Sequence, residues 1–343
     1  MKPFLEVKNL TVEFPTEDGT VQATEDVSFS LDLGETLAIV GESGCGKSVS
    51  NMAIMGLHNP KRTQISGSAI FNLESGPIDA INTDSETLRK MRGKTMSMIF
   101  QDPMSSLHPY YTVGNQIAEA WHLHNEGSRK TGAKRAAEML DLVGIPDSHK
   151  RIDDFPHQFS GGMRQRVMIA MAVVNNPKLL IADEPTTALD VTVQSQILTL
   201  LKTMQKEFNM AIILITHDLG VVASIADRIN VMYAGRLVEQ GTVDEIFYKS
   251  VHPYTLGLLG SIPRVDQSID KRLKTIQGQP PSLIELPSGC AFEPRCEFAT
   301  HVPKGLCKTS RPETTEKSIG HFARCHLSAA EIYEINRFQK ADR

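Results

Sequence analysis

Hydrophobic and polar residues follow three different patterns along the chain. From about residue 4 to residue 34 they alternate, as in the segment Val-Ser-Phe-Ser-Leu at residues 27–31. Alternation is typical of antiparallel strands that have one face in water. Residues 17–19, Glu-Asp-Gly, predict the turn that joins two such strands.

Short, almost wholly apolar runs mark the middle of the chain, and each ends in a polar or glycine-rich turn. Such runs are expected of parallel strands that are buried on both faces. They occupy residues 37–40, 179–182 and 212–215. Roughly from residue 115 to residue 176 the pattern is helical, and the segment 131–143 is rich in Ala, Lys, Glu and Leu.

The third pattern begins near Thr242 and becomes irregular after Pro263. This part of the chain carries further prolines at positions 280, 281, 287, 294, 303 and 312. The sequence shows no internal repeat and no low-complexity tract. We therefore expect a main domain over residues 1–241 and a C-terminal extension over residues 242–343.

Charge is nearly balanced, with 36 basic and 40 acidic residues among 343. This balance argues against a nucleic-acid partner, which usually calls for a basic excess. No stretch approaches the roughly 20 consecutive apolar residues that span a bilayer. Glu6, Lys8 and Glu13 interrupt any signal-peptide-like run at the N-terminus. We expect a cytosolic chain whose membrane role comes through a partner.

A glycine-rich motif directly follows the first apolar run. It fits the pattern G-x-x-x-x-G-K-[ST] in the strand context that this pattern requires. Glycines let backbone N–H groups turn inward around phosphates, Lys47 can reach the β- and γ-phosphates, and Ser48 can ligate Mg²⁺. Cys45 is interpreted as a spacer that contributes only its backbone, and the alternative for the motif is a turn with an incidental lysine. The predicted nucleotide-binding residues here are Gly41, Glu42, Ser43, Gly44, Cys45, Gly46, Lys47 and Ser48.

Two carboxylates end the second apolar run. Asp183 suits a water-mediated hold on Mg²⁺, and Glu184 can orient or deprotonate a water molecule. Apolar strands that end in acidic residues are common in α/β proteins, so this feature gains its weight from the phosphate-binding motif. Together the two motifs indicate nucleotide hydrolysis.

Residues 159–166, Phe-Ser-Gly-Gly-Met-Arg-Gln-Arg, resemble the signature sequence of ABC ATPases. By itself, Ser-Gly-Gly before a helical run is a helix N-cap with exposed amides, which can bind a phosphate. A simple helix cap is the alternative. The resemblance implies that Ser160, Gly161 and Gly162 serve a nucleotide bound to a second cassette, in a head-to-tail pair.

The remaining ABC elements occur in the expected order. Gln101 resembles the Q-loop residue that senses Mg²⁺ and contacts membrane subunits, and Ala188-Leu189-Asp190 resembles the D-loop. His217 resembles the switch histidine that contacts the γ-phosphate, and Phe14 resembles the aromatic residue that stacks on adenine. Two residues depart from the generic pattern, Met163 in place of Gln and Phe14 in place of Tyr or Trp. Neither departure removes a charge that the chemistry needs.

The segment Val-His-Pro-Tyr-Thr at residues 251–255 narrows the resemblance to the ATPases of oligopeptide and dipeptide permeases. The likeness covers residues 5–326, and it is greatest to the first of the two paired ATPases. It implies a peripheral protein at the cytoplasmic face of the cell membrane. The implied partners are a homologous second ATPase, two transmembrane permease subunits and an extracytoplasmic solute-binding protein.

Four of the five cysteines lie in the C-terminal extension. Their gaps of five, ten and seventeen residues differ from those of structural zinc sites, so spacing alone favours no metal. The resemblance includes permease ATPases whose four-cysteine tail holds a [4Fe-4S] cluster, which four thiolates can ligate. We expect such a cluster, with Zn²⁺ as the alternative, to staple an irregular, proline-rich segment. The predicted ligands are Cys290, Cys296, Cys307 and Cys325.

The expected fold is a RecA-like α/β core with an antiparallel β-subdomain, a helical subdomain over about residues 102–176 and a small C-terminal extension. ATP would lie between the phosphate-binding loop of this chain and the signature of its partner. Glu184 would polarise the attacking water, while Lys47 and His217 would hold the γ-phosphate. Mg²⁺ would be held by Ser48, Gln101 and Asp183.

Two other functions fit part of the sequence. A soluble ABC ATPase acting in translation or DNA repair typically carries paired cassettes or a long coiled coil, and this chain has a single set of nucleotide motifs. An importer of nickel, oligosaccharide or glutathione would use a similar ATPase, because substrate choice resides in other subunits. We expect import of oligopeptides or dipeptides.

Overall fold

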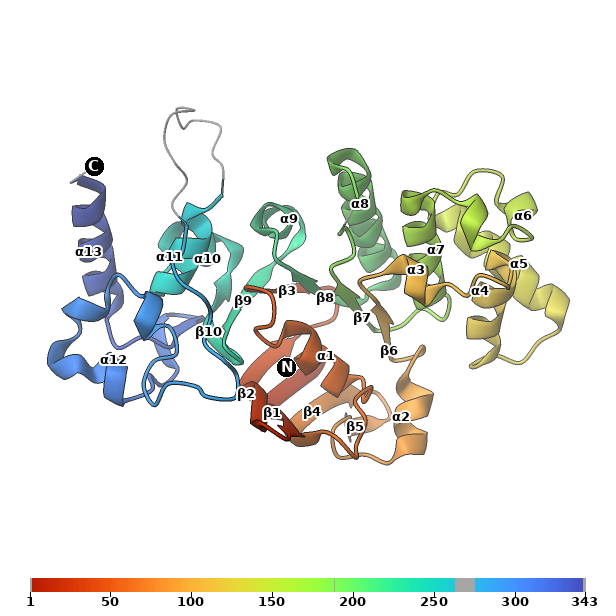
Figure 1. Ribbon diagram of the computed structural model, residues 1–343. Helices are drawn as coiled ribbons and strands as arrows, with labels where there is room; N and C mark the ends of the chain where they lie inside the picture. The colour runs from red at the N-terminus through yellow and green to blue at the C-terminus, as the bar shows by residue number, and fades with distance from the viewer. Residues whose placement is uncertain (1, 188, 263–274, 342–343) are drawn as a thin grey trace. The chain divides into compact units, whose positions relative to one another are not determined.

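The computed structural model describes residues 2–187, 189–262 and 275–341. The chain forms two compact units, each assembled from segments that are distant in the sequence (Figure 1). Unit 1 comprises Met1–Leu5, Ser30–Thr36 and Ile70–Ile215, and unit 2 comprises Glu6–Phe29, Leu37–Ala69 and Thr216–Arg343.

Three short parallel strands form the buried sheet of unit 1. Every residue in them is buried, because apolar side chains fill both faces of the sheet. In register, Ile181 pairs with Met98 on one side and with Ile213 on the other. The strands predicted at residues 179–182 and 212–215 are confirmed. The three strands are β6 (Met96–Ile99), β7 (Leu179–Asp183) and β8 (Ala211–Thr216).

Helices α4, α5 and α7 pack together in unit 1. Each begins at a hydroxyl side chain, Thr112, Ser128 or Ser160, which accepts a backbone N–H of the first turn. The helical pattern predicted between residues 115 and 176 is therefore confirmed. The helices of unit 1 are α2 (Ser85–Met91), α3 (Pro103–Ser106), α4 (Val113–His122), α5 (Arg129–Leu142), α6 (Ser148–Arg151), η1 (Pro156–Gln158), α7 (Gly161–Val173) and α8 (Val191–Phe208).

A hairpin near the N-terminus belongs mainly to unit 2. Its two strands are joined at Glu17 and Asp18, where the sequence predicts a turn, and β1 lies between β2 and β4. Leu10 and Val12 alternate with less buried residues along β1, as expected of a strand with one wet face. The end of β4 pairs antiparallel with β5 inside unit 1. The strands are β1 (Leu5–Thr16), β2 (Gly19–Leu31), β4 (Gln64–Leu73) and β5 (Gly76–Asp79).

The strand that precedes the glycine-rich motif belongs to a mixed sheet in unit 2. β3 pairs in parallel with β9, while β10 runs antiparallel to both β9 and β12, and β12 pairs with β11. The C-terminal extension therefore adds strands to the sheet that carries the motif. The strands are β3 (Thr36–Val40), β9 (Arg228–Tyr233), β10 (Arg236–Thr242), β11 (Thr315–Ser318) and β12 (His321–Ala323).

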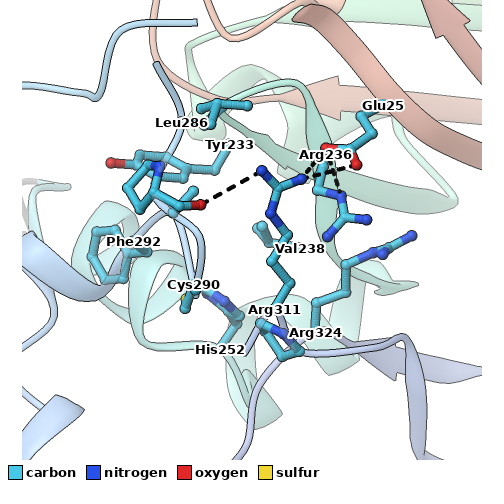
Figure 2. Close-up of a pocket in the computed structure, with 15 residues that line it drawn as sticks. Glu25, Tyr233, Arg236, Val238, His252, Leu286, Cys290, Phe292, Arg311 and Arg324 are labelled. Atoms are coloured by element: carbon cyan, nitrogen blue, oxygen red, sulfur yellow. Dashed lines mark hydrogen bonds and ion pairs between the residues drawn. The ribbon is translucent and has the colours of Figure 1, made fainter. Parts of the chain in front are cut away.

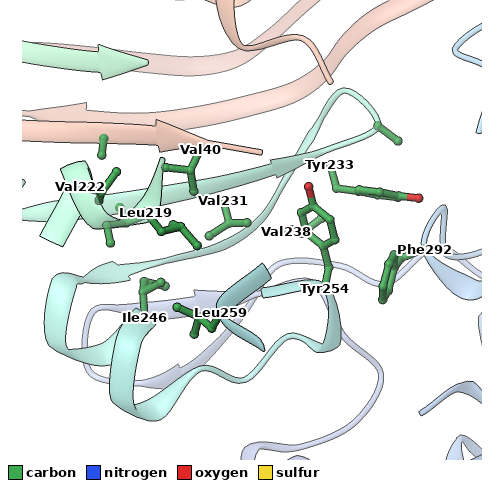
Figure 3. Packing of buried hydrophobic residues seen from close by; sticks show 13 residues of the cluster. Val40, Leu219, Val222, Val231, Tyr233, Val238, Ile246, Tyr254, Leu259 and Phe292 are labelled. Atoms are coloured by element: carbon green, nitrogen blue, oxygen red, sulfur yellow. The ribbon is translucent and has the colours of Figure 1, made fainter. Parts of the chain in front are cut away.

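Apolar residues from distant parts of unit 2 share one core (Figure 3). The rings of Tyr233, Tyr254 and Phe292 meet at tilted or edge-to-face angles, with centroids 4.6, 5.2 and 5.4 Å apart. Phe292 belongs to the cysteine-bearing extension, so this part of the extension is held by the same core as β9. The domain boundary predicted between residues 241 and 242 stays a prediction.

Short helices complete unit 2, and among the described residues of the chain no helix combines the length and apolar character that a membrane crossing needs. α10 begins at a reciprocal capping box between Thr242 and Glu245. The helices of unit 2 are α1 (Lys47–Ile54), α9 (Leu219–Ile225), α10 (Val243–Lys249), α11 (Pro253–Gly260), η2 (Glu293–Arg295), η3 (Ala299–His301), η4 (Pro303–Gly305), α12 (Leu306–Thr309) and α13 (Ala329–Ala341).

A buried carboxylate holds the C-terminal extension to β10. Glu239 is 0% exposed and accepts hydrogen bonds from the Ser250 hydroxyl at 3.0 Å and from the backbone N–H groups of Val251 and His252 at 2.6 and 3.2 Å. Nε2 of His321 lies 2.8 Å from its Oε1. A carboxylate without these partners would not be buried, since an unpaired charge away from water costs several kcal/mol.

Replacing Glu239 by alanine should therefore destabilise unit 2 strongly. We expect a loss of roughly 3 kcal/mol or more in the free energy of unfolding, because four polar partners lose their acceptor in a buried site. Glu334→Ala, at an exposed position of α13, is the control and should change stability by less than about 0.5 kcal/mol. Urea unfolding followed by circular dichroism measures both. Equal midpoints for the two variants would contradict the role given to Glu239.

Candidate nucleotide-binding site

The glycine-rich motif forms a tight loop between β3 and α1 in unit 2. A Cβ atom on Gly41 would clash with the backbone oxygen of Met232, and one on Gly46 would clash with the backbone oxygen of Ala23. Gly46 also has a φ of 101°, which a residue with a side chain rarely adopts. Glycine is therefore required for the loop to turn this closely and to direct its N–H groups inward.

Lys47 is the first residue of α1, and its side chain folds back over the loop. The residue is 6% exposed, and its ammonium donates hydrogen bonds to the backbone oxygens of Gly41 and Glu42 at 2.8 and 2.9 Å. The positive charge thus lies at the N-terminus of a helix, where anions bind favourably. Cys45 is buried beneath the lysine, and burial raises the pKa of its thiol. A neutral thiol agrees with the interpretation of Cys45 as a spacer.

Two residues that sequence reasoning missed fix the orientation of Glu42 in the loop. Both terminal nitrogens of Arg295 donate to the Glu42 carboxylate, at 2.6 and 2.9 Å. The hydroxyl of the fully buried Tyr254 accepts the Glu42 backbone N–H at 2.9 Å. Tyr254 lies in the segment at residues 251–255 that carries the permease resemblance, so that signal was available. No sequence signal pointed to Arg295, because the sequence around a single arginine in a proline-rich tail does not indicate which residue it contacts.

The carboxylates of unit 1 lie at the end of β7. Asp183 is the last, buried residue of that strand, and Glu184 follows with a left-handed φ of 47°. The Gln101 side-chain amide donates to Oε2 of Glu184 at 2.9 Å, and the Thr187 hydroxyl donates to the same oxygen at 2.8 Å. Strained backbone of this kind is found at functional sites. The predicted Mg²⁺-sensing glutamine and the predicted base are thus in direct contact, although they are 83 residues apart in sequence.

The signature residues and the D-loop residue lie at the starts of two neighbouring helices in unit 1. Ser160 caps α7 through the backbone N–H of Met163, and Asp190 caps α8 through the N–H of Val193 at 3.0 Å. A Cβ atom on Gly162 would lie 2.7 Å from Val193 Cγ1, so this glycine allows the starts of α7 and α8 to approach each other. Ser160 and Gly161 are exposed. Ala188 of the D-loop motif lies outside the described residues.

The last two predicted residues belong to unit 2. Phe14 is half-buried on β1, and its ring meets that of His58 edge to face at 5.5 Å. His217 is exposed and directly follows β8 in the chain. The roles predicted for Phe14 and His217, toward adenine and the γ-phosphate, stay predictions.

Comparison with known proteins places these motifs in a family. Residues 24–187 match the family described as ABC transporter, and residues 238–302 match the one described as oligopeptide/dipeptide transporter, C-terminal region. The oligopeptide transport ATP-binding protein OppD of Haemophilus influenzae is 52% identical over 97% of this chain and 99% of its own length. The dipeptide transport ATP-binding protein DppD of Bacillus subtilis is 50% identical over 95% of each chain. This chain belongs to the ABC transporter ATP-binding family.

Solved structures agree with this assignment. The dimeric structure of a bacterial ABC transporter cassette matches with a TM-score of 0.61 and 29% sequence identity, over 70% of this chain and 98% of that one. A second match is a dimeric post-hydrolysis state bound to ADP and phosphate, at 28% identity and the same TM-score. The expected P-loop ABC ATPase fold is confirmed. As an ABC ATPase, the chain binds and hydrolyses ATP with Mg²⁺.

The prediction of an iron–sulfur cluster is wrong. Among the described residues, which include all four tail cysteines, no three His, Cys, Asp or Glu side chains are arranged to hold a metal ion. The same finding gives no support to the Zn²⁺ alternative. Burial raises the pKa of every tail thiol, to about 12 at Cys296 and about 11 at Cys307 and Cys325. In the metal-free chain these thiols are therefore protonated at neutral pH.

The tail does not need a metal staple, because it has an apolar core of its own. The four cysteines line one small pocket together with Phe298 and Val302. Cys290 donates its backbone N–H to the Cys307 oxygen at 2.8 Å, which joins the two ends of this segment. The prolines of the extension predicted an irregular segment, but they do not prevent the apolar side chains of this segment from being buried. The buried residues of this core are Val251, Phe298, Val302, Cys307, Ala323, Leu327 and Ile332.

The contact between Arg295 and Glu42 should contribute to ATP binding. We expect Arg295→Gln to raise the Kd for ATP by about tenfold, because a bidentate, charge-assisted pair orients the phosphate-binding loop. Arg295→Lys should raise the Kd by a smaller factor, since lysine keeps the positive charge but cannot donate two parallel hydrogen bonds to the carboxylate. Fluorescence titration with ATP measures the Kd. Arg129→Gln, at an exposed position in the first turn of α5, is the matched control. The prediction fails if Arg295→Gln binds ATP as tightly as this control.

Proposed function

We propose that this chain is the ATP-hydrolysing subunit of an ABC importer of oligopeptides or dipeptides. The observation that carries the proposal is the match of residues 238–302 to the C-terminal region of oligopeptide and dipeptide transporters. Relatives named as oligopeptide and dipeptide transport ATP-binding proteins extend the likeness over nearly the whole chain. Their names favour peptides over nickel, oligosaccharide or glutathione, and favour transport over a soluble role.

The proposed chemistry assigns a separate role to each predicted site residue. Lys47 and His217 stabilise the γ-phosphate, and Glu184 polarises the water that attacks it. The hydrogen bonds from Gln101 and Thr187 support this role, because they hold Oε2 of Glu184 in a defined orientation. Mg²⁺ neutralises developing charge on the phosphates when bound. The residues proposed to interact with it are Ser48, Gln101 and Asp183.

The signature is proposed to act on ATP bound to a second cassette. The exposed cap formed by Ser160 and Gly161 supports this, since N–H groups at a helix start can bind a phosphate from another chain. Two solved relatives are described as dimeric. The proposed assembly contains a homologous second ATPase, two transmembrane permease subunits and an extracytoplasmic solute-binding protein. This chain would then lie peripherally at the cytoplasmic face of the membrane.

Substitution of the proposed base, Glu184, and of the loop lysine, Lys47, should have different effects on ATP binding and hydrolysis. Glu184→Gln should keep ATP binding and lower turnover by roughly 100-fold or more, because the amide cannot act as a base. Lys47→Ala should weaken ATP binding itself, since a buried cation at the loop is lost. ATP affinity and steady-state hydrolysis are measured in the assembled complex, with Glu126→Gln at an exposed loop position as control. Near-normal hydrolysis in Glu184→Gln would remove that residue from the mechanism.

Activity should depend on the partner subunits. We expect the isolated chain to be mainly monomeric and to hydrolyse ATP slowly, because its own nucleotide lacks a partner's signature. Addition of the second ATPase and the permeases should raise the rate. Ser160→Arg in this chain should lower the rate of the complex without changing ATP binding to this chain. Full activity from the isolated monomer would contradict the shared site and favour a soluble enzyme.

A further inference from the structure

Three arginines converge on one small pocket in unit 2, and none of the residues assigned to ATP lines it. They come from separate segments, since Arg236 lies on β10, Arg311 follows α12 and Arg324 follows β12. Figure 2 shows the three side chains close together at one wall of the pocket, with Glu25 from β2. Apolar side chains, among them Leu286 and Phe292, also line the pocket.

The charges at this pocket do not balance. Arg311 donates to both oxygens of Glu25, at 2.9 and 2.7 Å, and Nε of Arg236 lies 3.4 Å from the same carboxylate. Arg324 donates through Nη2 to the Asp26 carboxylate at 2.6 Å. Three guanidinium groups thus share two carboxylates. His252 also lines the pocket and adds no charge near neutral pH, because burial lowers its pKa to about 4.

Several N–H donors at the pocket have no acceptor in the protein. Arg324 is only 6% exposed, yet its Nε and Nη1 are buried without a hydrogen-bond partner. Nε of Arg236 is buried as well and makes no hydrogen bond, since its approach to Glu25 at 3.4 Å is an ion pair of poor geometry. A buried donor that stays unsatisfied costs about 1–3 kcal/mol, and more if it is charged. Such groups call for an acceptor from outside the chain.

Repulsion among the arginines supports this view. The pKa of Arg236 lies below its usual range because of burial and because of the neighbouring charges of Arg324 and Arg311. A bound anion would offset this repulsion. Guanidinium forks match the geometry of oxyanions, and phosphate groups in particular accept several such hydrogen bonds at once.

We propose that this pocket binds a small oxyanion of the phosphate class, held by Arg324 and Arg236 and separate from the phosphate-binding loop. The donors are contributed by β10 and by the segment after β12, while the two carboxylates that face them lie on β2. The bound anion therefore joins the segment after β12 to β10. This site does not depend on what the transporter imports.

The test uses inorganic phosphate and the full-length protein. Because the phosphate-binding loop can also bind phosphate, titration calorimetry is done with Lys47→Ala, at constant ionic strength adjusted with chloride. We expect Lys47→Ala to retain a phosphate site and Lys47→Ala/Arg324→Gln to bind at that site at least about tenfold more weakly, because a buried charged donor is lost. In an otherwise native chain, Arg324→Gln should keep ATP binding.

Matched variants separate the site from a general effect of charge or folding. Lys47→Ala/Arg129→Gln removes an exposed arginine and should bind phosphate like Lys47→Ala. If circular dichroism shows that Arg324→Gln does not fold, Arg236→Gln replaces it, and the same loss is expected. Phosphate affinity that is equal with and without these pocket arginines would overturn the proposal, as would the absence of any phosphate site in Lys47→Ala. Acetate that binds as tightly as phosphate would overturn the phosphate class.

Discussion

The phosphate-binding loop of this chain turns in a space too narrow for side chains, and much of unit 2 serves to keep it there. Backbone oxygens of Met232 and Ala23 close the space beside Gly41 and Gly46. Met232 lies on β9, which pairs with β3 directly before the loop. A loop with this geometry cannot be stabilised by packing of its own side chains. Its shape depends on the sheet around it and on contacts to the one outward carboxylate, Glu42.

Through those contacts the C-terminal extension helps to position the phosphate-binding loop. Tyr254 and Arg295 reach Glu42 from two parts of the extension. Tyr254 belongs to the core around Tyr233, and Arg295 donates a hydrogen bond to the Tyr233 hydroxyl at 3.3 Å. Glu239 fixes the start of the same segment from within β10. Because buried charges need defined partners, each of these groups restricts the position of its neighbours. The extension and the loop are therefore parts of one packed structure.

The two charged sites of the extension differ in how their charges are matched. Arg295 and Glu42 form a closed pair in which both carboxylate oxygens accept a hydrogen bond. These hydrogen bonds to Glu42 raise the pKa of Arg295 further above its usual range. Two of the arginines around Glu25, Arg236 and Arg324, have buried N–H groups that make no hydrogen bond. The first arrangement suits a structural contact, whereas the second suits a ligand. The tail cysteines resemble neither, since their neutral thiols pack as apolar side chains.

The sequence by itself determined the strands, the helical region and the nucleotide motifs. These depend on local rules: apolar runs that are buried on both faces, glycines that permit a turn, and a hydroxyl or carboxylate that caps a helix. Only the tertiary structure decided the partners of Glu42, the contact between Gln101 and Glu184, and the grouping of three arginines. These contacts join residues tens to hundreds of positions apart, and an isolated arginine looks the same whether it is exposed or paired. The four cysteines were misjudged for the same reason, because clustering in sequence cannot distinguish a set of metal ligands from thiols that share an apolar core.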